Sequence, residues 1–118
     1  MRKSAVPRKI ELVFYRNAQS TEPVKDWLKA LPAAERHVMG QDLMRVQWRW
    51  PVGMPLCRAM GQGLWEVRST LPGNRIARVL FFAHEEKLVA LHGLIKKTAK
   101  MPAADLKLAR QRMKEVKT

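Results

Sequence analysis

The strongest constraint on the fold is a change in the spacing of apolar residues near residue 56. From Leu56 onward, apolar residues alternate with other residues, a period of two that is typical of β-strands. Before this point they recur every three or four positions, as they do on one face of an α-helix. A chain with this pattern is expected to pack helices against a sheet built mainly by its second half.

Four strands are predicted in the second half of the chain. They are "PLCRAMG", "LWEVRS", "RIARVLFFA" and "KLVALHGLI", separated by Gly61, "LPGN" and "HEEK". In "LPGN", Pro72 presets φ and Gly73 can take a positive φ, which favours a type II turn. One more strand is predicted at "KIELVFY" (9–15), where β-branched and aromatic residues are enriched.

Three helices are predicted around these strands. Ser20 or Thr21 is expected to cap the first, and Pro32 opens the second, which ends near "WPVGMP" because proline cannot continue it. Pro102 lies at the first turn of the last helix. The expected apolar stripes are Val24, Trp27, Leu28 and Leu31; Met39, Leu43, Val46 and Trp50; and Leu106, Ala109, Met113 and Val116.

The element order β-α-α-β-β-β-β-α predicts an α+β fold. We expect a mostly antiparallel, twisted sheet that packs against an N-terminal helical hairpin and a C-terminal helix. The 118 residues are the size of one domain, spanning 1–118, and the 47% of hydrophobic residues argue against disorder.

The charge balance indicates a polyanionic partner. Lys and Arg outnumber Asp and Glu by 23 to 10, a net charge of +13. The surplus is larger in residues 56–118, with 13 basic and 5 acidic residues, than in 1–55, with 10 and 5. A field of this sign attracts nucleic acid, free or on a ribosome, and we expect such a partner.

The chain is expected to act in the cytoplasm and away from membranes. Its single cysteine, Cys57, cannot form an internal disulfide and is expected to be a small buried residue. The first apolar run, Ile10–Tyr15, is interrupted by Glu11 and is too short for a signal peptide or a membrane span.

The predicted hairpin at 63–82 is unusually basic, with three arginines and one acid. Strand alternation places Glu66 and Arg68 on one face of their strand, and puts Arg78 among large apolar residues. A mid-strand arginine can pack its stem while its guanidinium reaches a cleft and binds phosphate. The alternative for Arg68 is a structural ion pair with Glu66.

A second basic group ends the last predicted strand. Lys96 and Lys97 close "LHGLIKK", and Lys100 follows. A meander of strands can bring this pair onto the same sheet surface as the arginines, although two lysines at a strand end are also typical of an ordinary solvated surface.

The segments "KIELVFY", "LWEVRS", "RIARVLFF", "HGLIKKTAKMP" and "LKLARQRMKEV" together resemble the RelE/ParE toxin superfamily, in particular its HigB-like, phage-derived branch. The resemblance extends over nearly the whole chain. It implies a toxin encoded beside a helix-turn-helix, HigA-like antitoxin. It also implies that this toxin enters the ribosomal A site and cleaves mRNA there with no metal and no other cofactor.

The implied reaction is attack by a ribose 2′-OH on the adjacent phosphate, which leaves a 2′,3′-cyclic phosphate and a 5′-OH. It needs a proton acceptor, cations near the phosphate and a proton for the leaving oxygen. The resemblance matches Arg78 to an arginine that contacts the scissile phosphate, Lys96 and Lys97 to a basic pair, and Arg68 to a basic position on the preceding strand. Further RNA contacts are expected from Arg58, Arg75 and Lys100.

The proton acceptor stays open. Glu66 stands where some members have a basic residue, and the tyrosine that others use near the C-terminus has no counterpart, since Tyr15 is the only tyrosine. Glu66 can accept the proton or serve as a salt-bridge partner. His92, which strand phase groups with Ala90 and Leu94, can accept it or be a hydrogen-bonded core histidine.

Other classes of function find less support. The ten acids are scattered without metal-ligand spacing, and no phosphate-binding loop or nucleophile motif is present. Trp27 and Trp50 fall on apolar stripes and are expected in the core, whereas Trp48 lies off its stripe and is a candidate contact. The alternative function is a non-nuclease of the same fold, either a ParE-like gyrase inhibitor or a basic module that binds nucleic acid or protein.

Overall fold

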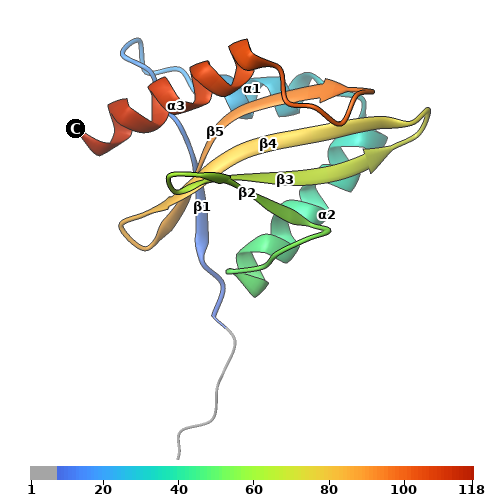
Figure 1. Cartoon of the computed structure of the whole chain (residues 1–118), viewed down its shortest axis with the longest axis horizontal. Coiled ribbons are helices and arrows are strands. Elements are labelled where there is room, and N and C mark those ends of the chain that lie inside the picture. The colour runs from blue at the N-terminus through green and yellow to red at the C-terminus, as the bar shows by residue number, and fades with distance from the viewer. Residues whose placement is uncertain (1–7) are drawn as a thin grey trace, which may run out of the picture.

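A five-stranded sheet runs through the centre of the computed structural model, which describes residues 8–118 (Figure 1). The sheet order is β1-β5-β4-β3-β2. Strand β1 pairs with β5 in parallel, and the other neighbours are antiparallel. The strands are β1 (Glu11–Phe14), β2 (Cys57–Gly61), β3 (Leu64–Leu71), β4 (Arg75–His84) and β5 (Lys87–Lys96). The predicted α+β layout is confirmed.

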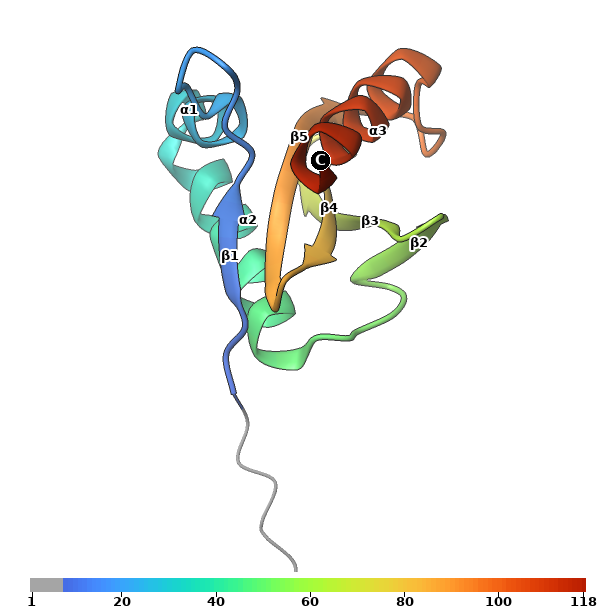
Figure 2. The same cartoon turned by 90° about the vertical axis from the view of Figure 1, so that its left-hand side faces the viewer.

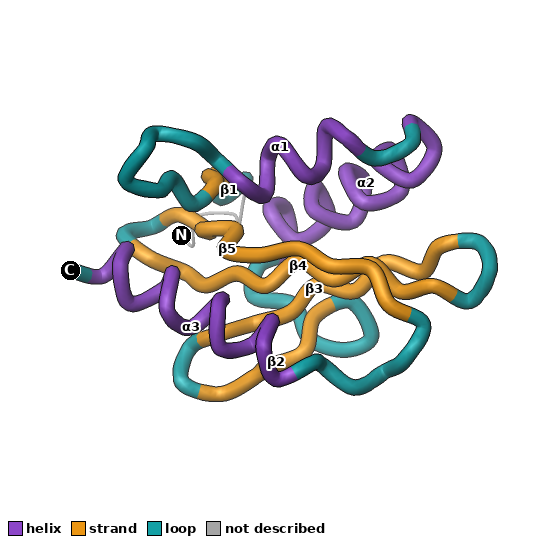
Figure 3. Tube along the Cα trace, turned by 90° about the horizontal axis from the view of Figure 1, so that it is seen from above, coloured by secondary structure: helices purple, strands orange, loops and turns teal. Residues whose placement is uncertain are grey.

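The helices cover opposite faces of this sheet. Helices α1 (Pro23–Ala30) and α2 (Ala33–Arg49) lie on one face, and α3 (Ala103–Lys117) lies on the other (Figures 2 and 3). Each face has its own apolar core. The core under α1 and α2 includes Val24, Met39, Leu43, Val46, Val67, Val79 and Phe81, and the core under α3 includes Leu64, Leu80, Phe82, Leu91, Ala109 and Met113. The three predicted apolar stripes therefore face the sheet.

The start of α1 differs from the prediction. Glu22 occupies the N-cap position, no side chain caps the helix, and the proposed caps at Ser20 and Thr21 are wrong. These residues belong to a turn organised by Asn17, whose side-chain oxygen accepts the backbone N–H groups of Gln19 and Thr21 at 3.0 Å. Because residues 17–21 form this turn, the helix begins after it, at Pro23. The fixed φ of proline suits the first position of a helix.

Strands β3 and β4 form the predicted hairpin and pair along the full length of β3, from Leu64 opposite Phe82 to Leu71 opposite Arg75. Gly73 in the connecting turn has a φ of +80°, as predicted, and Asn74 follows with a φ of +59°. Glycine and asparagine are the residues that adopt this backbone region at least cost. The hairpin thus fixes which residues of the two strands share a face.

A register shift in β5 determines where His92 lies. Leu80 pairs with His92 but the next residue, Phe81, pairs with Ala90, so Leu91 is an extra residue. Such a bulge interrupts the alternation of faces. Ala90 therefore belongs to the α1/α2 core, whereas His92 contacts Asp105 of α3. The prediction that His92 shares a face with Ala90 is wrong.

Candidate functional site

Four charged side chains from three neighbouring strands lie together. Strand β3 contributes Glu66 and Arg68; Arg58 of β2 is directly opposite Glu66, and Arg78 of β4 is directly opposite Arg68. Side chains directly opposite each other project from the same face of a sheet. We call Arg58, Glu66, Arg68 and Arg78 the Arg–Glu cluster. The structure thus brings together two of the predicted catalytic arginines with Glu66 and Arg58.

Arg78 and Glu66 form the buried centre of the cluster. Their side chains are 0% and 1% exposed, and Arg78 Nε lies 3.0 Å from Glu66 Oε2. The guanidinium also donates from Nη2 to the carbonyl oxygen of Thr98, at 2.6 Å. Thr98 belongs to the loop between β5 and α3, so this loop lies against Arg78.

The hydrogen bonds of this buried pair are incomplete. Nε and Nη1 of Arg78 and Oε1 of Glu66 are buried and have no hydrogen-bond partner among the residues that the structure describes. Burial lowers the pKa of the Arg78 guanidinium from its ordinary value; Glu66 opposes this, while Arg68 and Arg58 add to it. Nε still faces the Glu66 carboxylate, so the donor left open is Nη1. Native proteins leave few buried donors without an acceptor, and this one marks the position as one where an anion would be stabilised.

Arg68 and Arg58 are the accessible part of the cluster. The Arg68 side chain is 22% exposed, with Nε 3.7 Å from Glu66 Oε1, and Arg58 is exposed. The ion pair that sequence analysis offered as an alternative for Arg68 is therefore present. With three arginines and one glutamate, the cluster keeps an excess of positive charge and can hold an anion such as a phosphate.

The family assignment comes from comparison with known proteins. Residues 26–114 match the family model "Phage derived protein Gp49-like (DUF891)". The chain belongs to the Gp49-like family. This is a toxin-type family related to RelE and HigB. No curated protein matches the chain.

The lysines of this Gp49-like chain lie at the end of β5 and in the loop after it. Lys96 is the last residue of β5 and is opposite Ile76, and Lys97 immediately precedes Thr98. Lys96, Lys97 and Lys100 are all exposed. None of the three makes an ion pair with any of residues 8–118, so their charges are available to a partner.

Arg75 is held away from the cluster. At the start of β4 it forms an ion pair with Glu35 of α2 and donates from Nε to the carbonyl oxygen of Pro72 at 3.2 Å. Its guanidinium therefore connects the β3–β4 turn to α2. Of the expected RNA contacts, Arg58 lies in the cluster, Lys100 lies in the β5–α3 loop, and Arg75 has protein partners.

His92 is paired with a carboxylate that sequence analysis did not find. Its Nε2 lies 2.6 Å from Asp105 Oδ1 in the first turn of α3, and both side chains are partly exposed. His92 is opposite Leu80, two positions along β4 from Arg78, so it lies on the cluster's face of the sheet. The only signal for Asp105 in the sequence is its position just after Pro102, where an acid favours a helix start.

Thr98 was also missed, because it acts through its backbone carbonyl, which no side-chain pattern reveals. Tyr15 is engaged elsewhere: its hydroxyl donates to Glu115 of α3 at 2.5 Å, and this bond and burial raise the tyrosine pKa. It therefore does not replace the tyrosine that is missing from the C-terminal part of the chain.

Metal sites and membrane spans find no support in the described residues. Residues 8–118 contain no group of three or more histidine, cysteine, aspartate or glutamate side chains placed to hold a metal ion. No helix in this range has the length and apolar character needed to cross a bilayer. Cys57 is buried, as predicted, and burial raises the pKa of its thiol to about 11.

Proposed function

We propose that this Gp49-like protein is the toxin of a type II toxin–antitoxin pair and cleaves mRNA on the ribosome without a metal. Membership of a toxin-type family is consistent with this function. The observation that carries the proposal is the Arg–Glu cluster. It sets a buried arginine that has an unsatisfied donor beside two accessible arginines, and the exposed Lys96 ends β5, the strand next to β4.

The proposed reaction is an internal transesterification of RNA. A ribose 2′-oxygen forms a bond to the adjacent phosphorus as the bond from phosphorus to the 5′-oxygen breaks. The 2′-OH proton passes to a base, and the leaving 5′-oxygen takes up a proton. The products are a 2′,3′-cyclic phosphate and a 5′-OH. Negative charge on the phosphate oxygens rises in the transition state, so fixed cations accelerate the step.

The arginines and lysines supply these cations. Arg68, Lys96 and Lys97 are accessible and first hold the RNA backbone. A phosphate oxygen then takes the place of the Thr98 carbonyl as the acceptor of Arg78 Nη2, which requires the β5–α3 loop to move aside. Glu66 is a positioning residue in this scheme because it holds the guanidinium groups of Arg78 and Arg68.

His92 is the proposed base. A carboxylate can only accept hydrogen bonds, so Asp105 holds the neutral imidazole with its hydrogen on Nε2 and leaves Nδ1 as a proton acceptor. Asp105 positions the ring. Glu66 suits the role less well because its side chain is buried and faces two arginines.

The proposed partners are mRNA in the ribosomal A site and a helix-turn-helix antitoxin of the HigA type. The net charge of +13 supports a polyanionic substrate. An antitoxin partner is consistent with a toxin-type family. We propose the cytoplasm as the compartment, since it holds both partners.

The decisive experiment is primer extension on a defined mRNA, with and without translating ribosomes, in the presence of EDTA. We expect new 5′ ends only during translation. The Lys96→Ala/Lys97→Ala double variant should cut at least about a hundredfold more slowly, because it removes two charges near the phosphate. Lys107→Ala/Lys114→Ala, which removes two exposed lysines from α3, is the matched control and should cut normally.

The His92→Gln variant tests the proposed base independently of the cations. It keeps a hydrogen-bonding side chain but removes the proton acceptor, so the rise of the cleavage rate with pH that we expect for the parent should be lost. An unchanged pH profile would eliminate His92 as the base. If the parent protein makes no cuts with or without ribosomes, the nuclease proposal fails.

The complete burial of Arg78 favours a second candidate, a non-nuclease of the same fold. In that case the Arg78–Glu66 pair is structural and the basic surface only binds. A ParE-like gyrase inhibitor would block DNA supercoiling by purified gyrase while leaving translated mRNA intact. This pair of assays distinguishes the two functions.

A further inference from the structure

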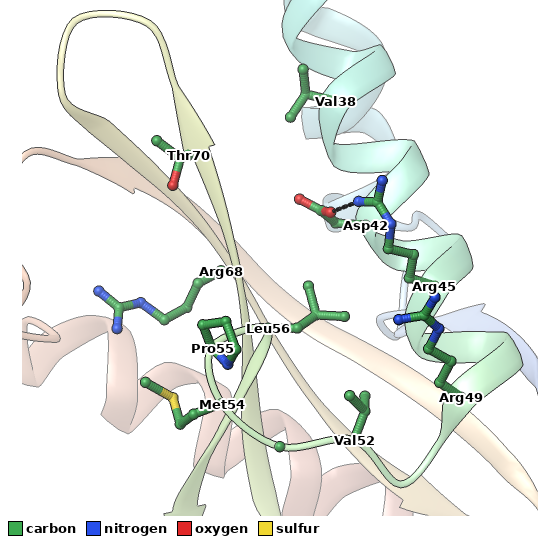
Figure 4. A pocket seen from close by; sticks show the side chains of 11 residues that line it. Val38, Asp42, Arg45, Arg49, Val52, Met54, Pro55, Leu56, Arg68 and Thr70 are labelled. Atoms are coloured by element: carbon green, nitrogen blue, oxygen red, sulfur yellow. Dashed lines mark hydrogen bonds and ion pairs between the residues drawn. The ribbon is translucent and has the colours of Figure 1, made fainter.

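A cleft of about 660 Å³ opens between helix α2 and the edge of β3 (Figure 4). Its walls come from α2, from the segment that joins α2 to β2, and from the end of β3 that β2 does not cover. The lining residues are Val38, Asp42, Arg45, Arg49, Val52, Gly53, Met54, Pro55, Leu56, Arg68 and Thr70. We call this the α2–β3 groove.

The groove and a neighbouring hollow include the large hydrophobic side chains that are exposed on the described chain. The large hydrophobic side chains that are exposed in residues 8–118 are Met44, Trp48 and Met54, with 42%, 48% and 61% of their surface accessible. Met54 lines the groove, and Met44 and Trp48 line a second hollow of about 330 Å³ on α2. Arg45 and Arg49 line both. Clustered exposed apolar groups mark interaction sites, whereas scattered ones are ordinary.

The charged groups at the groove are almost all positive. Arg45, Arg49 and Arg68 line it, and its one acid, Asp42, is paired with Arg45 one helical turn away. In Figure 4, Arg45 and Arg49 extend from the α2 wall, and Arg68 extends from its strand on the side away from α2. An occupant with negative charges is therefore favoured.

The edge of β3 also offers unpaired backbone groups. β2 pairs with β3 only as far as Cys57 opposite Val67, and the last bond on this side runs from Arg68 N to Leu56 O, at 3.0 Å. Backbone groups of alternate residues point to the same neighbouring strand. The backbone N–H and C=O groups of Thr70 therefore point in the same direction as those of Arg68, which is into the groove. No strand of the described chain pairs with the Thr70 groups there.

We propose that the α2–β3 groove binds an extended, acidic segment of a partner protein that carries apolar side chains. Its backbone would pair with Thr70, its apolar side chains would cover Met54 and Leu56, and its carboxylates would contact Arg45 and Arg49. RNA fits this surface less well. The unpaired N–H and C=O groups of the β3 edge complement another peptide backbone, which RNA does not offer.

This inference goes beyond the proposed function and does not depend on it. Arg45 and Arg49 belong to neither the Arg–Glu cluster nor the lysines of β5. Arg68 lines both the groove and the cluster, so we leave it unchanged in the test.

The experiment selects octapeptides from a random phage-displayed library on the full-length chain. We expect the selected peptides to be rich in Asp, Glu and apolar residues. The most enriched one, made synthetically with a fluorescent label, should bind Arg45→Gln/Arg49→Gln at least about tenfold more weakly by anisotropy. Lys107→Gln/Lys114→Gln removes the same charge from α3 and should bind normally. Circular dichroism checks that both variants are folded.

Changes in the backbone NMR chemical shifts locate the peptide-binding site on the protein. The peptide should shift the amide signals of Thr70 and Leu56. Enrichment of neutral or basic peptides, equal binding to both double variants, or shifts confined to another surface would overturn the proposal. An eight-nucleotide uridine RNA that produces the same shifts and displaces the peptide would also overturn it, and would make the groove an RNA surface. Cleavage of mRNA is measured separately, so failure here leaves the proposed function standing.

Discussion

The two faces of the sheet bury different kinds of side chain from the same strands. On the α1/α2 face, β3 contributes Val67 and Leu71, which join a continuous apolar core. On the α3 face, the intervening positions of β3 carry Glu66 and Arg68, and Arg78 of β4 is buried opposite them. Both faces bury an apolar core, but only the α3 face also buries a charged pair.

This difference distinguishes the apolar core residues, which the fold requires, from the buried Glu66–Arg78 pair, which the fold tolerates. Burying a charged pair costs several kcal/mol per ion in desolvation, and the pair rarely stabilises a protein more than apolar residues of similar size would. The apolar cores on both faces therefore support the fold, and the α3 face in addition carries a charged centre whose presence packing does not explain. Such a centre is expected where function needs fixed charge.

The largest effect is expected from breaking the buried pair. Glu66→Ala leaves the Arg78 guanidinium buried without its counter-charge, which should lower the free energy of unfolding by about 3–5 kcal/mol. Urea denaturation measures the loss. The matched control is Glu35→Ala, which breaks the more exposed pair with Arg75 and should cost about 1 kcal/mol or less.

The double variant Glu66→Leu/Arg78→Met tests the same idea in the opposite direction. It removes both charges and keeps the volume, so it should be far more stable than Glu66→Ala. A double variant as unstable as Glu66→Ala would mean that the pair itself stabilises the fold, and the contrast between the faces would disappear.

The second-largest loss of stability is expected on the α1/α2 face, from a substitution of Gly93. A Cβ at this position would overlap the Trp27 ring, which packs α1 closely against β5. Gly93→Ala should therefore lower the unfolding free energy by about 2–3 kcal/mol, because a packed core resists insertion of extra atoms. Thermal denaturation measures it.

Gly40→Ala is the control for this substitution. Gly40 lies within α2, and a Cβ there would meet nothing within 4 Å. Alanine also forms helices more readily than glycine, so Gly40→Ala should raise the melting temperature. If the two alanine variants behaved alike, the tight packing of Trp27 on Gly93 would not be a determinant of stability.

The same contrast sets the limit of what the sequence predicts. Periodicity predicts the elements and the apolar stripes because each strand or helix shows its buried face in local spacing, and the positive φ of Gly73 follows from turn chemistry. The juxtaposition of Arg68 with Arg78 also follows, once the turn sets the hairpin register. The bulge at Leu91 could not be predicted, since its cause is the pairing with β4.

The contacts that complete the candidate site are less visible in the sequence. The Thr98 carbonyl reaches Arg78 across 20 positions, and Asp105 reaches His92 across 13. Both depend on how the β5–α3 loop is folded over the sheet, which is set by tertiary packing of α3. The full burial of Arg78 has the same origin. The sequence pattern around a mid-strand arginine is the same whether or not a loop covers its side chain.

The smallest effect is expected on the α1/α2 face, in the pH dependence of the unfolding free energy that Cys57 contributes. Burial, with a contribution from Asp42, raises the pKa of the Cys57 thiol from its ordinary value near 9 to about 11 in the folded chain. The folded state thus holds this proton more tightly than the unfolded state. The resulting stability is fully present below pH 9 and is lost as the pH rises through 11. From pH 8 to pH 10 the expected loss is about 1 kcal/mol, on the basis of roughly 1.4 kcal/mol per unit of pKa.

The Cys57→Ala variant isolates this contribution from the lysines and Tyr15, which titrate in the same alkaline range. Its unfolding free energy should fall less between pH 8 and pH 10 than that of the parent chain, by about the same 1 kcal/mol. Parallel curves for the two proteins would mean that the thiol titrates alike in the folded and unfolded states. The apolar face would then admit enough water to ionise Cys57, and the charged and apolar faces of the sheet would differ in composition but not in dryness.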